Sequence, residues 1–233
     1  RSSQDNHGTA VAGVIAAEKD GELTVGVAPD ASLVSIYSPL SSSNFVQEIV
    51  NAFTYAKTLD ILNDSWGYAP KMYSLLPWAF LDNFNSPQFR PAYLALKDLA
   101  DNGRGGLGTV VVQSAGNSFN LGDDTNLHNF QNSRYIITVA GSDYVGDVSS
   151  FSSQGASILI AAPGGGANND SYLGEVLTTD RVGQAGYSPD DYRFISGTSF
   201  SAPVVSGVVA LMLEANPTLG YRDVQTILAY SAR

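Results

Sequence analysis

Two segments near opposite ends of the chain carry side chains that could do chemistry. HGTAVAG begins at His7, one of only two histidines, and starts an apolar pattern with helical spacing. GTSFSAP (197–203) crowds hydroxyl groups at the start of an apolar run that extends to residue 215. A Gly-Thr-Ser turn and a proline in the first helical turn would mount one exposed hydroxyl rigidly. The positive end of the helix dipole would then face any anion that forms there.

A third segment, VVVQSAGNS (110–118), reads as a strand that ends in small residues and then Asn117. Each segment alone has an ordinary structural explanation. A histidine near a terminus is usually a surface residue, a serine at a helix start is usually a cap, and asparagine beside glycine is common in turns. The glycines of GRGGLG (103–108) suggest a nucleotide-binding loop. They precede the strand, whereas a dinucleotide-binding loop follows one, so we discard that function.

The elements that would position these segments alternate along the chain. Short apolar runs predict strands at 32–37, 61–66, 109–116, 135–141 and 157–164, and apolar residues at helical spacing predict helices at 45–59 and 91–103. This order indicates an α/β fold with a mostly parallel central sheet. The segment 165–196, rich in Gly, Asn and Asp, predicts a hairpin and loops. Residues 203–215, apolar on nearly all sides, predict a helix buried in the middle of the domain.

The composition excludes several classes of function. With 44% apolar residues, the 233-residue chain can form one domain with a large core. The absence of cysteine excludes disulfides, a thiolate zinc site and a cysteine nucleophile. A net charge of −10 opposes binding to nucleic acids and to anionic membranes, and the longest apolar run is too short to span a bilayer. We therefore expect neither nucleic acid nor membrane as a partner.

Taken together, HGTAVAG, SAGN and GTSFSAP, in this order, resemble the subtilisin-like serine proteases over essentially the whole chain. The likeness is strongest to the kexin and furin branch, through the following segments: SWG (65–67), GRGGLG, NSRYIITV (132–139), VLTTDR (176–181) and LEANPTLGYRDVQ (213–225). The resemblance implies that residues 1–233 form a three-layer catalytic domain. It also implies a serine endopeptidase that cleaves polypeptides through an acyl-enzyme.

The resemblance assigns three catalytic roles. His7 would be the general base and then the general acid, and Ser199 the nucleophile, because a serine hydroxyl is a poor nucleophile near neutral pH until an imidazole takes its proton. The side-chain amide of Asn117 and the backbone N–H of Ser199 would donate to the oxyanion of the tetrahedral intermediate.

Two further segments would hold the substrate as an added strand. The residues implied are Ser65, Trp66 and Gly67 in the first segment and Ser114, Ala115 and Gly116 in the second. In the furin-like enzymes, acidic side chains and a calcium ion line the pocket for a basic residue before the scissile bond. Here Asp123 is kept, but His128, Pro70 and Ser153 occupy the other acidic positions, so we expect no requirement for a basic residue. Tyr68 and Phe130 would suit an apolar residue, and Asp124 is the carboxylate that could restore a basic preference.

The resemblance leaves one catalytic group without a match. In this family an aspartate on a strand upstream of the histidine completes the triad, and Asp5 is too close to His7 in sequence to reach the far side of its ring. We therefore expect the aspartate to lie upstream of residue 1, in a segment outside this chain. Residues 1–233 alone should then be nearly inactive.

A structural calcium ion is also implied by the resemblance. The loop EKDGELT (18–24) would offer the Asp20 side chain and the carbonyl oxygens of Glu18, Glu22 and Thr24. Because calcium takes six to eight oxygens, this loop needs further donors. A solvated polar turn explains the loop equally well.

Two alternative functions are open. The chain could be a catalytically inactive homologue that binds peptides or serves as a structural module, although no substitution at His7, Ser199 or Asn117 indicates this. It could be a carboxyl-type serine peptidase of acidic pH with the same fold, but that group lacks the HGT motif. The resemblance further implies a secreted or periplasmic location, a propeptide, and a β-sandwich domain after Arg233.

Overall fold

The computed structural model describes residues 6–38, 43–67, 82–166 and 174–232. Tyr68 and Pro70, two of the expected pocket residues, lie outside the described residues.

A four-stranded parallel sheet forms the centre, in the order β1-β2-β3-β4. The strands are β1 (Ile61–Asp64), β2 (Val110–Ser114), β3 (Ile136–Ser142) and β4 (Ile158–Pro163). All of β2 and nearly all of β3 is buried, as expected for parallel strands covered on both faces. A separate antiparallel pair, β5 (Val176–Thr179) and β6 (Tyr192–Ile195), confirms the hairpin predicted within residues 165–196.

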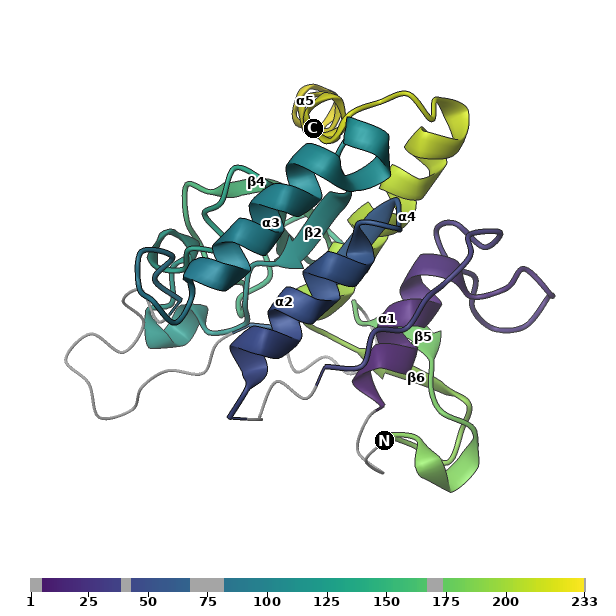
Figure 1. Cartoon of the computed structure of the whole chain (residues 1–233). Coiled ribbons are helices and arrows are strands. Elements are labelled where there is room, and N and C mark those ends of the chain that lie inside the picture. The colour runs from purple at the N-terminus through teal and green to yellow at the C-terminus, as the bar shows by residue number, and fades with distance from the viewer. Residues whose placement is uncertain (1–5, 39–42, 68–81, 167–173, 233) are drawn as a thin grey trace.

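Helices cover both faces of the sheet (Figure 1). Helices α2 (Phe45–Ala56) and α3 (Arg90–Asn102) pack side by side on one face, and α4 (Thr198–Ala215) crosses the other, in contact with all four strands. Helix α1 (His7–Ala16) packs on α4 and β5. The remaining elements are α5 (Tyr221–Ser231) and the short 3₁₀ turns η1 (Gly103–Gly106), η2 (Phe119–Leu121), η3 (Thr125–Leu127) and η4 (Gly183–Ala185). This arrangement confirms the predicted α/β class with a mostly parallel sheet between helical layers.

The strand predicted at 32–37 is wrong. These residues form no strand, and the side chains of Leu33 and Val34 are 49% and 50% exposed. A strand requires a neighbour that satisfies its backbone N–H and C=O groups, and none of the described strands lies beside this run. Within the described residues, β1 likewise pairs only with β2.

Helix α4 begins five residues earlier than the apolar pattern indicated, at Thr198 rather than residue 203. Ser199 is therefore in the first turn of the helix. Pro203 has no N–H to donate to the carbonyl of Ser199, which is four residues earlier. That carbonyl instead accepts a hydrogen bond of 2.8 Å from the Ser65 hydroxyl. The proline thus frees the backbone of the nucleophile candidate to bond to another segment.

Among the described helices, α4 alone is long and apolar enough to cross a membrane. More than half of it is buried inside the molecule, and it contacts every strand of the central sheet. Such features are those of a core helix, which passes the same test of length and apolarity.

Candidate active site

The packing of α1 against the start of α4 brings the imidazole of His7 next to the residue that follows Ser199. The ring centroids of His7 and Phe200 are 5.7 Å apart. Phe200 belongs to a buried apolar cluster with Ala10 and Val11 of α1. The spacing of HGTAVAG therefore aligns one face of α1 with α4 and sets its first residue beside Phe200, the neighbour of Ser199 in sequence.

Helix α1 is also fixed on its other side by β5. The hydroxyl of Thr178 donates to the carbonyl of Ala10 at 2.7 Å. A β-carbon added to Gly13 would lie 2.2 Å from the hydroxyl oxygen of Thr179, so only glycine permits this close approach. Gly13, the second glycine of HGTAVAG, thus allows α1 to pack closely against β5 and so helps to position His7 at the start of the helix.

Burial lowers the pKa of His7 below its ordinary value of 6.5. The cause is desolvation, which disfavours the charged imidazolium. The ring therefore stays neutral, and able to accept a proton, at a lower pH than an exposed histidine.

Asn117 is held in one orientation by Thr198. Its side-chain Oδ1 accepts hydrogen bonds from the backbone N–H and the hydroxyl of Thr198, both at 2.8 Å. The amide nitrogen Nδ2 is left on the side of Gly197, where an added β-carbon would lie 3.3 Å from it. Since Ser199 is two residues further along, Nδ2 is a free donor next to the first turn of α4. The role of Thr198 was missed by the sequence reasoning, which treated it only as part of a turn.

The two proposed substrate-binding segments follow the carboxyl ends of neighbouring parallel strands. The SWG segment (Ser65, Trp66 and Gly67) follows β1, and the SAG segment (Ser114, Ala115 and Gly116) ends β2 and continues beyond it. A hydrogen bond of 3.4 Å from the Ser114 hydroxyl to the Trp66 carbonyl joins them. The Ser199 hydroxyl in turn donates to the Ser65 carbonyl at 3.5 Å. The structure thus brings both segments to Ser199.

Behind the SAG segment lies a buried hydrogen-bonded triad. Asp123 Oδ1 is 2.7 Å from His128 Nε2, and Asp123 Oδ2 accepts from the Ser153 hydroxyl at 2.7 Å. All three side chains are buried. A β-carbon on Gly116 would lie 2.8 Å from Ser153 Oγ and 2.9 Å from Asp123 Oδ2. Three of the residues expected in the specificity pocket are therefore together, directly behind the SAG segment.

The predicted metal loop is an exposed turn between α1 and the following segment. Asp20 Oδ1 accepts from the backbone N–H of Glu22 at 3.0 Å, and the Thr24 hydroxyl donates to the carbonyl of Leu177 at 3.2 Å. Glu18 is exposed as well. Within the described ranges, no three His, Cys, Asp or Glu side chains group closely enough to hold a metal ion.

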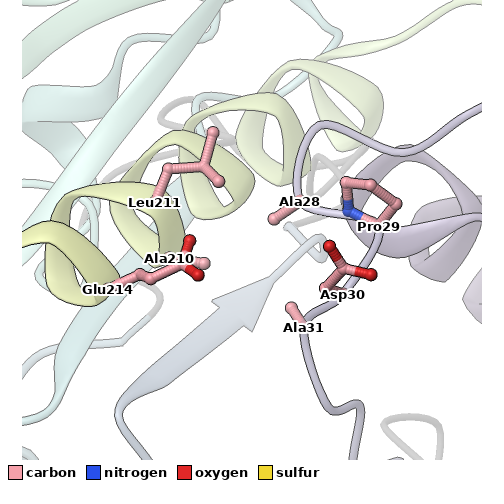
Figure 2. Close-up of a pocket in the computed structure, with 7 residues that line it drawn as sticks. All are labelled: Ala28, Pro29, Asp30, Ala31, Ala210, Leu211 and Glu214. Carbon is pink, nitrogen blue, oxygen red and sulfur yellow. The ribbon is translucent and has the colours of Figure 1, made fainter.

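A separate hollow of about 240 Å³ lies along the second half of α4 (Figure 2). Its lining residues are Ala28, Pro29, Asp30, Ala31, Ala210, Leu211 and Glu214. At a rise of about 1.5 Å per residue, Leu211 is roughly 18 Å along the helix from Ser199. The hollow holds two carboxylates and no nucleophile, so it is not part of the candidate active site.

The comparisons with known proteins agree with this geometry. The model of the subtilase family matches residues 1–233, and the chain belongs to that family. It is 33% identical, over 97% of its length, to a probable subtilase-type serine protease of Deinococcus radiodurans, of which it covers 28%. It is 31% identical, over 99% of its length, to a dibasic-processing endoprotease of Schizosaccharomyces pombe, of which it covers 30%.

Two further matches bear on cofactor and fold. A calcium-dependent protease of Trichormus variabilis is 29% identical over 98% of the chain, which covers 35% of that protein. Among solved structures, a protease of Pseudoalteromonas arctica PAMC 21717 superposes with a TM-score of 0.75 at 27% identity, over 97% of this chain and 64% of that one. The chain thus has the subtilisin-like fold and spans about a third or less of the curated relatives named here.

Proposed function

We propose that the chain is the catalytic domain of a serine endopeptidase. The observation that carries this proposal is the fixed orientation of Asn117, whose Oδ1 is bonded to Thr198 and whose Nδ2 lies beside Gly197, two residues before Ser199. His7 takes the proton of the Ser199 hydroxyl as its oxygen attacks the substrate carbonyl carbon. Asn117 Nδ2 and the Ser199 backbone N–H donate to the resulting oxyanion.

The second half of the reaction uses the same groups. As the peptide C–N bond breaks, His7 gives its proton to the leaving amine, and an acyl-enzyme on Ser199 remains. A water molecule then attacks the acyl carbon, with His7 accepting its proton, and Ser199 is released with the proton returned to its oxygen. The lowered pKa of His7 supports this role because the ring must be neutral at the start of each half.

Labelling by a fluorophosphonate tests the nucleophile. We expect covalent modification of the full-length protein at Ser199, located by mass spectrometry, and loss of labelling in Ser199→Ala. Ser201→Ala is the matched control, since Ser201 is a buried serine two residues away on the same helix. Labelling elsewhere, or proteolysis that survives Ser199→Ala, would contradict the proposal. Peptide binding without labelling would favour the inactive peptide-binding module.

We also propose that the third member of the triad is an aspartate upstream of residue 1. Two features of the fold favour an additional strand: β1 has a neighbour on only one side among the described strands, and the apolar run 32–37 forms no strand with any described strand. A strand between them would complete the sheet. Residues 1–233 expressed alone should then show roughly 10⁴-fold lower turnover than the full-length protein. Equal turnover would show that the acid lies within this chain.

We also propose calcium binding by the loop 18–24, supported by the family resemblance and by the name of the Trichormus relative. Only one of the expected donors, Asp20, is a side-chain carboxylate, and one of its oxygens already accepts from the backbone N–H of Glu22. These donors are too few for calcium on their own, so no step of the mechanism uses the ion. A calcium-dependent rise in melting temperature that Asp20→Ala removes would support the site, and an unchanged rise would exclude it.

The location and the partners outside this chain rest on the resemblance. We propose a secreted or periplasmic protein that acts on polypeptides, made with a propeptide and a β-sandwich domain. Cell fractionation and mass spectrometry of the mature protein test these proposals.

A further inference from the structure

A carboxyl group that the proposed mechanism does not use lies directly behind the SWG segment. Asp64 is the last residue of β1, only 9% exposed, and immediately precedes Ser65. Its carboxyl accepts a hydrogen bond from the side chain of Trp66, while Oδ2 has no partner. A buried carboxyl oxygen without a partner is costly, so its presence at this position calls for an explanation.

The same strand end is bonded directly to Ser199 through the neighbours of Asp64. The Asn63 amide donates to the Ser65 hydroxyl at 2.9 Å, and that hydroxyl donates to the Ser199 carbonyl at 2.8 Å. Asn63 also accepts from Ser206 of α4, so it faces α4. Because side chains alternate along a strand, Asp64 faces the opposite side of the sheet. The SWG segment is therefore bonded to the Ser199 backbone on one side and adjoins Asp64 on the other.

Gln113 is placed to respond to the proton on Asp64. It lies opposite Asp64 in the register of β1 and β2, and is fully buried. Neither its amide oxygen nor its amide nitrogen has a hydrogen-bond partner. A neutral Asp64 can donate its O–H to the amide oxygen, whereas an ionised Asp64 can accept from the amide nitrogen, after the amide has turned over. The two side chains are not hydrogen-bonded to each other in the structure, and a different bond between them would become available in each protonation state.

Burial raises the pKa of Asp64 to about 7, and the Trp66 hydrogen bond opposes this shift. No described charged group forms an ion pair with Asp64. On the helices that cover this face, Lys57 pairs with Asp98 at 2.5 Å. Asp82 accepts from the backbone of Asn129 and Phe130. Both protonation states are thus accessible near neutral pH.

We propose that Asp64 is a positioning residue for peptide binding. Its carboxyl holds the side chain of Trp66, and through it the SWG segment, in an orientation that depends on whether the carboxyl carries its proton. An ionised carboxylate accepts a stronger hydrogen bond than a neutral carboxyl group, so the segment is held more firmly in the ionised state. The effect on substrate binding rests on the proposed peptidase function, whereas the effect on Trp66 does not.

The first test reads Trp66 without catalysis. In the full-length protein carrying Ser199→Ala, we expect tryptophan fluorescence to change with pH, with a midpoint within about one unit of 7. Asp64→Asn should remove this transition, whereas Asp60→Asn, an equivalent change at an exposed carboxylate of the same segment, should keep it. If the Asn variant does not fold, Gln113→Met serves instead, because it removes the amide that lies opposite Asp64 and should shift the midpoint. A transition that persists unchanged in these variants would overturn the proposal.

The second test reads substrate binding in the active protein. We expect KM for a peptide substrate to fall roughly threefold to tenfold as the pH rises through 7, the size expected when one hydrogen bond is rearranged. Asp64→Asn should leave kcat near the wild-type value and make KM independent of pH in this range. A KM that keeps its pH dependence in Asp64→Asn would contradict the role. Loss of activity in Ser199→Ala alone tests the proposed function and not this residue.

Discussion

The two substrate-binding segments are each backed by a buried aspartate, and the two aspartates differ in how their oxygens are used. Behind the SAG segment, Asp123 has one oxygen bonded to His128 and the other to Ser153. Behind the SWG segment, Asp64 bonds to Trp66 and leaves Oδ2 unpartnered. Buried carboxylates are tolerated when their oxygens are hydrogen-bonded. The surroundings of Asp123 therefore suit one protonation state, whereas those of Asp64 allow two.

This difference indicates that the SAG segment is held in one arrangement, whereas the SWG segment can respond to pH. The Ser153 hydroxyl bonds to Asp123, and the Ser153 backbone N–H donates to the carbonyl of Gly116 at 2.9 Å. These bonds fix the SAG segment, which immediately precedes Asn117. The SWG segment is hydrogen-bonded to the Ser199 backbone, but it is preceded by Asp64, whose negative charge is disfavoured by burial. The same substitution at the two sites should therefore have opposite effects.

The largest expected effect is a gain in stability from Asp64→Asn. The pKa of Asp64 is about 7 in the folded protein and 3.8 as the reference value, so the unfolded chain loses the proton first as the pH rises. Stability of the wild type should fall between pH 3.8 and about 7 and then level off. Because each pKa unit corresponds to about 1.4 kcal/mol, the variant should gain at most about 4 kcal/mol over the wild type across this window.

Denaturant unfolding of both proteins at several pH values measures this gap. Asp147→Asn is the control, because Asp147 is an exposed carboxylate and its substitution should give a small difference at every pH. A gap that shrinks as the pH rises, or an Asn variant less stable than the wild type above pH 7, would show that the folded protein stabilises the ionised form of Asp64.

The second largest effect is expected at Asn117, the residue that follows the SAG segment. Asn117→Ala removes a donor to the oxyanion while leaving Ser199 and His7 in place, so kcat should fall by about 10²–10³, a magnitude measured in subtilisin itself. KM should change little. Thr198→Val should cause a smaller loss of the same kind, since it removes one of the two bonds that orient the amide. Unchanged kcat in Asn117→Ala would mean that the oxyanion is stabilised by other groups.

The sequence predicted the fold well where an element depends on its own residues. The apolar runs that became β2, β3 and β4 lie within two residues of their predicted ends, because continuous apolar runs identify buried parallel strands. The prediction failed for residues 32–37, where forming a strand depends on a partner chain segment. It also misplaced the start of α4, because the small polar residues 198–201 carry no helical pattern of apolar spacing.

The candidate site was predictable as residue types but not as contacts. The motifs indicated His7, Asn117 and Ser199, and the structure brings them to one end of α4. The roles of Thr198 and of Asp64 depend on the register between distant segments, which no local pattern specifies. A carboxylate inside a predicted buried strand was the available signal for Asp64, since charged residues are rarely buried without a partner.

A third effect, smaller than the first two, is expected from Asp123→Asn. This variant loses a charged acceptor that serves two buried donors, so it should destabilise the protein by about 1–3 kcal/mol at neutral pH. Ser153→Ala is the matched variant that removes only one of the two hydrogen bonds, and it should cost less. Melting temperatures measured beside those of Asp64→Asn test the comparison directly. A gain in stability from Asp123→Asn would show that Asp123 and Asp64 do not differ in how the fold satisfies their oxygens.

The smallest effect expected concerns the residue before the scissile bond. We predict that the peptidase does not require Arg or Lys there, in contrast to what the name of the Schizosaccharomyces pombe relative indicates for that protein. Both oxygens of Asp123 are already bonded, so an arginine that enters beside Gly116 would lose water without gaining a carboxylate partner. Phe130, expected to suit an apolar residue, is fully buried in the core, with its ring centroid 5.6 Å from that of Trp66, so it offers the pocket no exposed surface.

A library of peptides that vary at this position measures the preference as kcat/KM. We expect a neutral apolar or aromatic residue to be cleaved at least as well as Arg or Lys. The variant His128→Asp sharpens the test, because it releases one oxygen of Asp123 and adds a second carboxylate behind Gly116. It should raise the value for Arg relative to neutral residues by roughly tenfold, the equivalent of about 1.4 kcal/mol. A wild-type preference for Arg or Lys of tenfold or more would mean that another carboxylate, such as Asp124, lines the pocket.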